Sequence, residues 1–166
     1  MSKTVKSILL VFGIIFLASF MAIAQDAGWF DMENCDMCRP LTEDPELLDN
    51  LTWEIYEISN GIVMLTTVNE GFEKSYEKVN TEMNKVVDRI MKGEKVQLCN
   101  SCQFMNQIYM RAPKVETIKT QNGDISIMTS DNPELVADLK TWARRSNEEM
   151  AKLEAKEIEH KLKHEH

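Results

Sequence analysis

Two Asn-Gly dipeptides constrain the fold of this chain most strongly, because each separates two runs rich in β-branched and aromatic residues. Asn60-Gly61 lies between residues 53–58 and 62–67, and Asn122-Gly123 lies between residues 115–120 and 124–129. A type I′ hairpin turn needs positive φ at both central positions, which asparagine and glycine tolerate. The sequence therefore predicts two antiparallel hairpins that turn at the Asn-Gly pairs. The apolar run at residues 62–65 predicts a central strand.

An amphipathic helix is expected after each hairpin. In the first half, apolar residues between Phe72 and Ile90 recur at steps of three and four, which predicts a helix capped by Asn69 and stopped at Gly93. In the second half, residues 130–134 (Ser-Asp-Asn-Pro-Glu) form a dense helix-start signal. Helices of this kind are expected to cover one face of an antiparallel sheet. The predicted fold class is therefore α+β.

The two halves follow one plan: a Cys-x-x-Cys motif, a short helix, a hairpin and a long helix. This order suggests an internal repeat. We predict a first repeat at residues 25–93 and a second at residues 94–150. Residues 151–166 are predicted to be a charged tail that contains all three histidines of the chain.

The first 24 residues have the features of a secretory signal peptide. Lys3 and Lys6 precede an apolar stretch at residues 8–21, and Ala22-Ile23-Ala24 supplies the small residues of a cleavage site. A retained membrane anchor is the alternative, but a membrane span needs about 20 apolar residues. Cleavage after Ala24 is therefore predicted. The mature protein would begin at Gln25 and be exported to the periplasm or the extracellular space.

The charge of the chain excludes some classes of partner. The sequence holds 27 acidic and 19 basic residues, for a formal net charge of −8, and the leader removes two of the lysines. Nucleic acids and anionic membranes attract basic surfaces, so neither is expected as a partner. No second apolar run follows the leader, so no membrane span is expected after cleavage. A metal ion or another protein remains the expected partner, and the oligomeric state is open.

All four cysteines occur in two Cys-x-x-Cys pairs, Cys35/Cys38 and Cys99/Cys102. Two such pairs can supply a tetrahedral set of four sulfur ligands. The sequence therefore predicts a binding site for zinc or copper, used for binding, delivery or sequestration of the metal. A shared site requires all four sulfurs to lie within about 8 Å, because Zn–S bonds are about 2.3 Å long.

Two other uses of the cysteines remain open. Export places thiols in an oxidising compartment, where cross-pairing would staple the two halves of a secreted interaction domain by disulfides. A thiol–disulfide oxidoreductase is the third possibility. The residues before the pairs, Asn34 and Leu98, are not the aromatic residues typical of a thioredoxin-like site. No histidine precedes His160, so a catalytic triad is not expected, and a binding protein is favoured over an enzyme.

The second half, from Cys99 to about Met150, resembles the heavy-metal-associated domain of copper chaperones and metal-transporting ATPases. That family runs strand, Cys-x-x-Cys loop, helix, hairpin, helix and final strand. The resemblance implies a first strand at residues 96–98 and metal ligands at Cys99 and Cys102, with a looser match at Cys35 and Cys38. The family's methionine two residues before the first cysteine is Gln97 here.

The three histidines offer a secondary metal site. His160 and His164 are four residues apart on an expected helix, and His166 ends the chain. Histidines with this spacing can share a metal ion. A charged terminus that frays makes weak, adventitious binding the expected behaviour.

Overall fold

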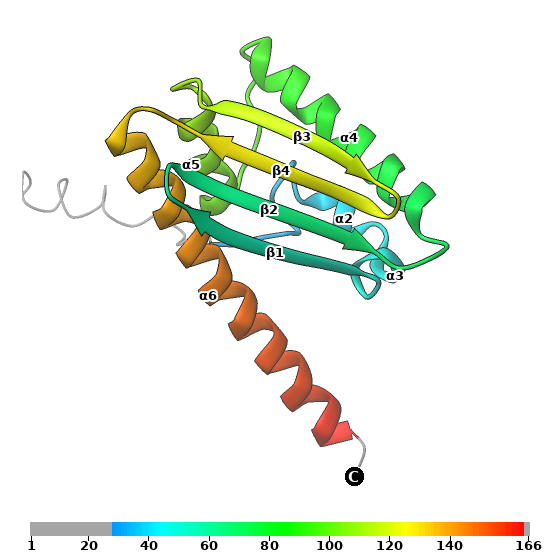
Figure 1. Ribbon diagram of the computed structural model, residues 1–166. Helices are drawn as coiled ribbons and strands as arrows, with labels where there is room; N and C mark the ends of the chain where they lie inside the picture. Colours follow the sequence, from blue (N-terminus) through cyan, green and yellow to red (C-terminus); the bar gives the residue numbers. More distant parts are fainter. Residues whose placement is uncertain (1–27, 165–166) are drawn as a thin grey trace, which may run out of the picture.

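The computed structural model describes residues 28–164, so the predicted signal peptide lies outside the described residues. A four-stranded antiparallel sheet forms one layer, and the helices pack against one of its faces (Figure 1). The α+β fold class is confirmed. None of the helices in this part of the chain is both long and apolar enough to cross a membrane.

Both hairpins are present. The strands are β1 (Leu51–Ile58), β2 (Gly61–Val68), β3 (Lys114–Thr120) and β4 (Gly123–Thr129), in the sheet order β1-β2-β4-β3. The predicted central position of residues 62–65 is therefore confirmed. The two hairpins meet where β2 pairs with β4, with Gly61 opposite Thr129 and Thr67 opposite Gly123. Gly61 and Gly123 thus occupy equivalent places at the two ends of this seam.

The predicted turn type is wrong. Strand pairing closes at Ile58–Gly61 and at Thr120–Gly123, so the turns are Ser59-Asn60 and Gln121-Asn122. Among the described non-glycine residues, only Ala112 has a positive φ, so neither asparagine adopts the type I′ conformation. Both glycines instead begin a strand, where their lack of a side chain lets β2 and β4 approach closely.

Two short helices precede the first hairpin and one helix precedes the second, and a long helix follows each hairpin; the internal repeat stays a prediction. The helices are α2 (Arg39–Thr42), α3 (Pro45–Leu48), α4 (Glu73–Met91), α5 (Asn100–Tyr109) and α6 (Pro133–His164). The region predicted as a separate tail continues α6 as one helix that runs beyond the sheet (Figure 1).

The predicted helix ends are partly correct. The Asn132 side chain accepts hydrogen bonds from the backbone N–H groups of Glu134 and Leu135, which caps α6. Gly93, with φ of +76°, follows the last residues of α4 as predicted. Asn69 is not the cap of α4, because the N-cap residue is Phe72. The Asn69 side chain instead donates to Asn50, which joins the end of β2 to the segment before β1.

The core lies between the sheet and the helices. Ile62 of β2 and Met128 of β4 are fully buried against Leu135 and Leu139 of α6. A second cluster packs Val68 of β2 against α4 and the short helices α2 and α3. Burying an aliphatic side chain of this size stabilises the fold by about 1.5–3 kcal/mol. These two clusters hold both long helices on the same face of the sheet.

Tyr76 joins α4 to the sheet, and its removal is expected to destabilise the protein. Its hydroxyl donates to a carboxylate oxygen of Asp124 on β4 at 2.6 Å. Replacing Tyr76 by phenylalanine is expected to lower the free energy of unfolding by about 1–2 kcal/mol at pH 7, measured by urea denaturation, because the partly buried Asp124 carboxylate loses one of its two donors and keeps only Lys119.

The Tyr76 contribution is expected to depend on pH. Burial, and next the interactions with Asp124, raise the pKa of Tyr76 above its ordinary value of about 10. A raised pKa in the folded state gives a contribution that is complete below pH 10 and is lost as the pH rises further. The difference between the wild type and Tyr76→Phe should therefore shrink when urea denaturation is repeated at about pH 11. An unchanged difference would contradict this assignment.

Candidate metal centre

The structure brings all four predicted ligands together. The sulfur atoms of Cys35, Cys38, Cys99 and Cys102 all lie within 4.8 Å of one another. Cys38 Sγ is 3.9 Å from Cys99 Sγ and 3.5 Å from Cys102 Sγ. A tetrahedral zinc ion with Zn–S bonds of about 2.3 Å requires sulfur–sulfur distances of roughly 3.8 Å. The distances from Cys38 Sγ to Cys99 Sγ and Cys102 Sγ are close to this value, and all four sulfurs are near enough together to be candidate ligands of one ion.

The first cysteine pair is held by a tight turn. The carbonyl oxygen of Cys35 accepts hydrogen bonds from the N–H groups of Cys38 (3.0 Å) and Arg39 (2.9 Å). Cys38 is the N-cap residue of α2, and Pro40 follows near the helix start. This turn brings the two side chains to the same side of the loop.

The second pair lies at the start of α5. Cys99 is its N-cap residue, with an extended backbone, and Cys102 lies in its first turn. The carbonyl oxygen of Cys99 accepts a hydrogen bond from the N–H of Gln103 at 2.9 Å. The positive end of a helix dipole favours a thiolate over a thiol. This placement suits cysteines that bind a cation.

Hydrogen bonds join the two cysteine loops although a hairpin and the helices α2, α3 and α4 separate them in sequence. The N–H of Asp36 donates to the carbonyl oxygen of Gln97 at 2.8 Å, and the N–H of Gln97 donates to the Asp36 carboxylate at 3.3 Å. Arg89 of α4 lies 3.5 Å from the same carboxylate. Asp36 therefore fixes one cysteine loop against the other.

Two tryptophans hold the second loop in place. The N–H of Ser101 donates to the carbonyl oxygen of Trp29 at 3.0 Å, and Ser101 Oγ accepts a hydrogen bond from the indole of Trp142 at 3.1 Å. Trp142 belongs to α6, so this helix positions the residue between Cys99 and Cys102. No spacing in the sequence predicts these contacts, since they join segments far apart in the chain.

The four thiols have different environments. Cys35 and Cys99 are buried, whereas Cys38 and Cys102 are partly exposed. Hydrogen bonds from Cys102 and then Cys38 lower the pKa of Cys35 to about 6, and hydrogen bonds from the other three thiols, Cys102 first, lower the pKa of Cys99.

The opposite pKa shift occurs at the partly exposed positions. Hydrogen bonds to Cys35, Cys38 and Cys99 raise the pKa of Cys102. The hydrogen bond with Cys102 lowers the pKa of Cys38, but those with Cys35 and Cys99, together with burial, outweigh it and raise that pKa. The pKa of each thiol therefore depends on its hydrogen bonds with the other three.

All four cysteines, each in the described part of the chain, are free thiols. A disulfide has a sulfur–sulfur distance of about 2.05 Å, well below the 3.5 Å between Cys38 and Cys102. The cross-paired disulfides considered as an alternative are therefore not formed in this structure.

The predicted histidine site stays a prediction. The side chains of His160, His164 and His166 lie outside the described residues. Among the residues that are described, the four cysteines form the one group of three or more metal-ligating side chains close enough to share an ion.

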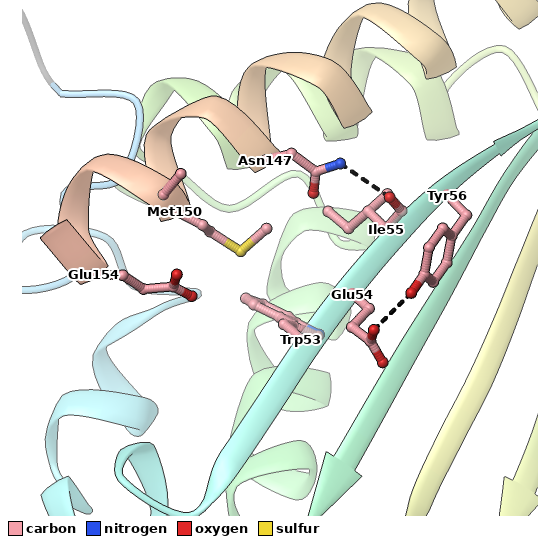
Figure 2. Close-up of a pocket in the computed structure, with 8 residues that line it drawn as sticks. Trp53, Glu54, Ile55, Tyr56, Asn147, Met150 and Glu154 are labelled. Carbon is pink, nitrogen blue, oxygen red and sulfur yellow. Dashed lines mark hydrogen bonds between the residues drawn. The ribbon is translucent and has the colours of Figure 1, made fainter.

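An open groove lies between β1 and α6, away from the cysteines (Figure 2). Its volume is about 260 Å³, and Trp53, Met150 and Glu154 are among the residues that line it. The Asn147 amide donates to the backbone carbonyl of Ile55 at 2.9 Å, as the dashed line in Figure 2 shows. Asn147 thus occupies a backbone acceptor of an edge strand, which discourages strand addition there. No cysteine lines the groove.

Comparisons with known proteins do not identify the chain. No protein-family model, curated protein or solved structure matches it. The strand at residues 96–98 implied by the resemblance to heavy-metal-associated domains is absent, because residues 94–99 lie outside the sheet. Membership of that family remains a hypothesis.

Proposed function

We propose that this protein binds one metal ion through Cys35, Cys38, Cys99 and Cys102. The observation that carries the proposal is the convergence of four sulfurs, from two segments far apart in sequence, within 4.8 Å. Tetrahedral sets of four sulfurs are typical of zinc and of iron–sulfur centres. Zinc is the first candidate, and copper(I) is the second because thiolates are soft ligands.

Four cysteine ligands favour a permanently bound structural ion over a catalytic or readily exchanged ion. Catalytic zinc sites keep one coordination position open for water or substrate, whereas structural sites use four protein ligands. Here four cysteines would fill a tetrahedral shell, and two of them are buried. The ion would join the loop before α2 to the start of α5 and so link the two halves. Delivery of the metal to a partner is less consistent with a site of this kind.

Export remains part of the proposal and rests on the sequence of residues 1–24. The mature protein would begin at Gln25 and work in the periplasm or outside the cell. Free thiols are at risk of oxidation in such compartments. A bound metal ion would hold the four sulfurs as thiolates and keep them from forming disulfides.

Metal analysis together with a thiol count tests this function. The protein is recovered after export without reductant or chelator, and its metal content and reactive thiols are measured before and after denaturation in EDTA. One zinc per chain, with four thiols that react only after denaturation in EDTA, would support the proposal. Four blocked thiols and no metal would refute it and favour the disulfide-stabilised domain.

A titration of the reduced, metal-free protein then identifies the type of site. Cobalt(II) serves as the probe, because tetrahedral thiolate coordination gives strong visible absorption. We expect saturation at one equivalent and displacement of cobalt by zinc. A variant with His160, His164 and His166 replaced by glutamine is the matched control and should saturate at the same point. Reversible cycling of one cysteine pair in a glutathione buffer, without metal, would instead indicate an oxidoreductase.

A further inference from the structure

The face of the sheet opposite the helices has an apolar centre and is uncovered within the described part of the chain. Ile62 and Met128 point to the helices and are fully buried. Successive side chains of a strand point to opposite faces, so the neighbouring residues point away from the helices. No residue of this outer face belongs to either buried core cluster. Solvated faces of antiparallel sheets are usually polar, so an apolar outer face requires an explanation.

The outer face has an aliphatic centre. Val63 and Leu65 of β2 lie beside Ile127 and Ile125 of β4, and all four side chains are only partly buried. Towards the edges, Tyr56 of β1 is 53% exposed and Ile118 of β3 is 44% exposed. Contiguous exposed apolar patches of this kind mark interaction sites on soluble proteins.

Two rows of side chains across this face are related by an approximate twofold axis. The strand register gives one row as Glu54, Leu65, Ile125 and Ile118, and the other, read in the opposite direction, as Glu116, Ile127, Val63 and Tyr56. Each row therefore runs from a glutamate, through two aliphatic residues, to a large apolar residue. The hydrogen bonds that end the β2–β4 seam, Val68 N–H to Asn122 O and Ser130 N–H to Asn60 O, follow the same relation.

We propose that this face binds a second copy of the chain. A twofold dimer requires a surface that is complementary to itself. In this dimer the two sheets stack face to face, and the twofold axis lies between them and runs perpendicular to the strands. The first row of one copy then lies over the second row of the other copy. On β1, Glu54 then faces Tyr56 of the second copy. On β3, Ile118 faces Glu116 of the second copy, so no glutamate faces another glutamate. The aliphatic centres face each other. Tyr56 already donates to Glu54 within one chain at 2.6 Å, so the two side chains are chemically compatible.

The size of the face predicts an association of moderate strength. Four strands spaced by about 4.8 Å and seven residues rising about 3.3 Å each give a face of roughly 440 Å² per copy. Standard interfaces bury about 800 Å² per partner. The dimer is therefore expected to be concentration-dependent and to form more weakly than one held by a standard interface.

Sedimentation velocity over a concentration series tests the proposal. The protein is recovered after export, its N-terminus is verified by mass spectrometry, and it is studied from about 1 to about 200 µM. We expect a shift from monomer to dimer. The shift should persist in EDTA if the chain stays folded, since the outer face contains none of the four cysteines. A monomer across the whole range would overturn the proposal.

A matched pair of substitutions on β3 locates the interface. Ile118 and Val115 are both 44% exposed, but Ile118 lies on the outer face, whereas Val115 pairs with Met128 on the helix side. Ile118→Glu, which sets a second carboxylate against Glu116 of the other copy, is expected to raise the dissociation constant at least tenfold, and Val115→Glu less than about twofold. Circular dichroism and metal content should be unchanged in both. Equal weakening by both variants, or by neither, would overturn the assignment of this face.

Discussion

Replacing Cys99 by serine is expected to abolish stoichiometric metal binding and to destabilise the protein in the presence of metal. Cys99 is buried and lies in the set of four converging sulfurs. A hydroxyl is a poor replacement for a thiolate as a zinc ligand, and binding energy at a structural site is also folding energy. A loss of metal affinity of at least about 100-fold corresponds to about 3 kcal/mol or more. Thermal unfolding with and without zinc measures this loss.

Chelation and reduction distinguish a metal site from a disulfide at the same cysteines. If a metal ion joins the halves, the stability difference between wild type and Cys99→Ser should nearly vanish in EDTA. If a disulfide joins them, the difference should persist in EDTA and vanish in a reductant. A difference that persists under both conditions would contradict the metal proposal and indicate that the cysteines contribute through packing alone.

The double variant Cys38→Ser/Cys99→Ser provides a second control. The two sulfurs are 3.9 Å apart and come from different halves of the chain. Once one ligand has been removed and the ion is lost, removal of the second should cost little more in zinc-loaded conditions. The two effects should therefore be strongly non-additive. Additive losses would show that the two cysteines do not share one ion.

The elements that depend on short stretches of sequence could be predicted well. The β-branched runs predicted both hairpins, and the apolar repeat from Phe72 to Ile90 predicted α4 with its stop at Gly93. These features depend on side-chain periodicity and local backbone preference, which a single segment contains. The convergence of the cysteine pairs was also a correct hypothesis, because two Cys-x-x-Cys motifs can complete one tetrahedral shell.

The features that depend on tertiary contacts could not be predicted. Asn69 matches an N-cap signal, but its side chain bonds to Asn50 across the fold. Likewise, Asp36 bridges the cysteine loops, and Trp142 holds Ser101 through a contact between distant segments. Each of these contacts joins segments that are far apart in sequence, so no local pattern encodes it.

The two Asn-Gly pairs show how a correct element can be inferred for an incomplete reason. The pairs predicted hairpins through the conformational freedom of a turn, yet each glycine begins a strand at the β2–β4 seam. A Cβ atom at Gly61 would lie 1.9 Å from the carbonyl oxygen of Met128, and one at Gly123 would lie 2.0 Å from that of Thr66. Space between the two hairpins therefore constrains both positions, and at Gly123 a φ of +144° adds a conformational constraint.

Substituting Gly61 by alanine is accordingly expected to be among the most destabilising changes in the sheet. The clashing atom is backbone in the central strand β4, so relief requires β2 and β4 to separate. Overpacking usually costs about 1–3 kcal/mol, and a backbone clash within a central sheet should cost at least about 3 kcal/mol. For a domain of this size, that loss corresponds to a decrease in melting temperature of roughly 10 °C.

Gly71→Ala is the matched control. Gly71 has a φ of +94°, a conformation that disfavours alanine, but a Cβ atom there would meet nothing within 4 Å. Its cost should be limited to backbone strain of about 1–2 kcal/mol. If conformational freedom alone governed these glycines, Gly71→Ala would be the more harmful change, because Gly61 does not have a positive φ. A larger loss of stability for Gly61→Ala, measured by urea denaturation, would establish that close approach of the two hairpins is the stronger constraint.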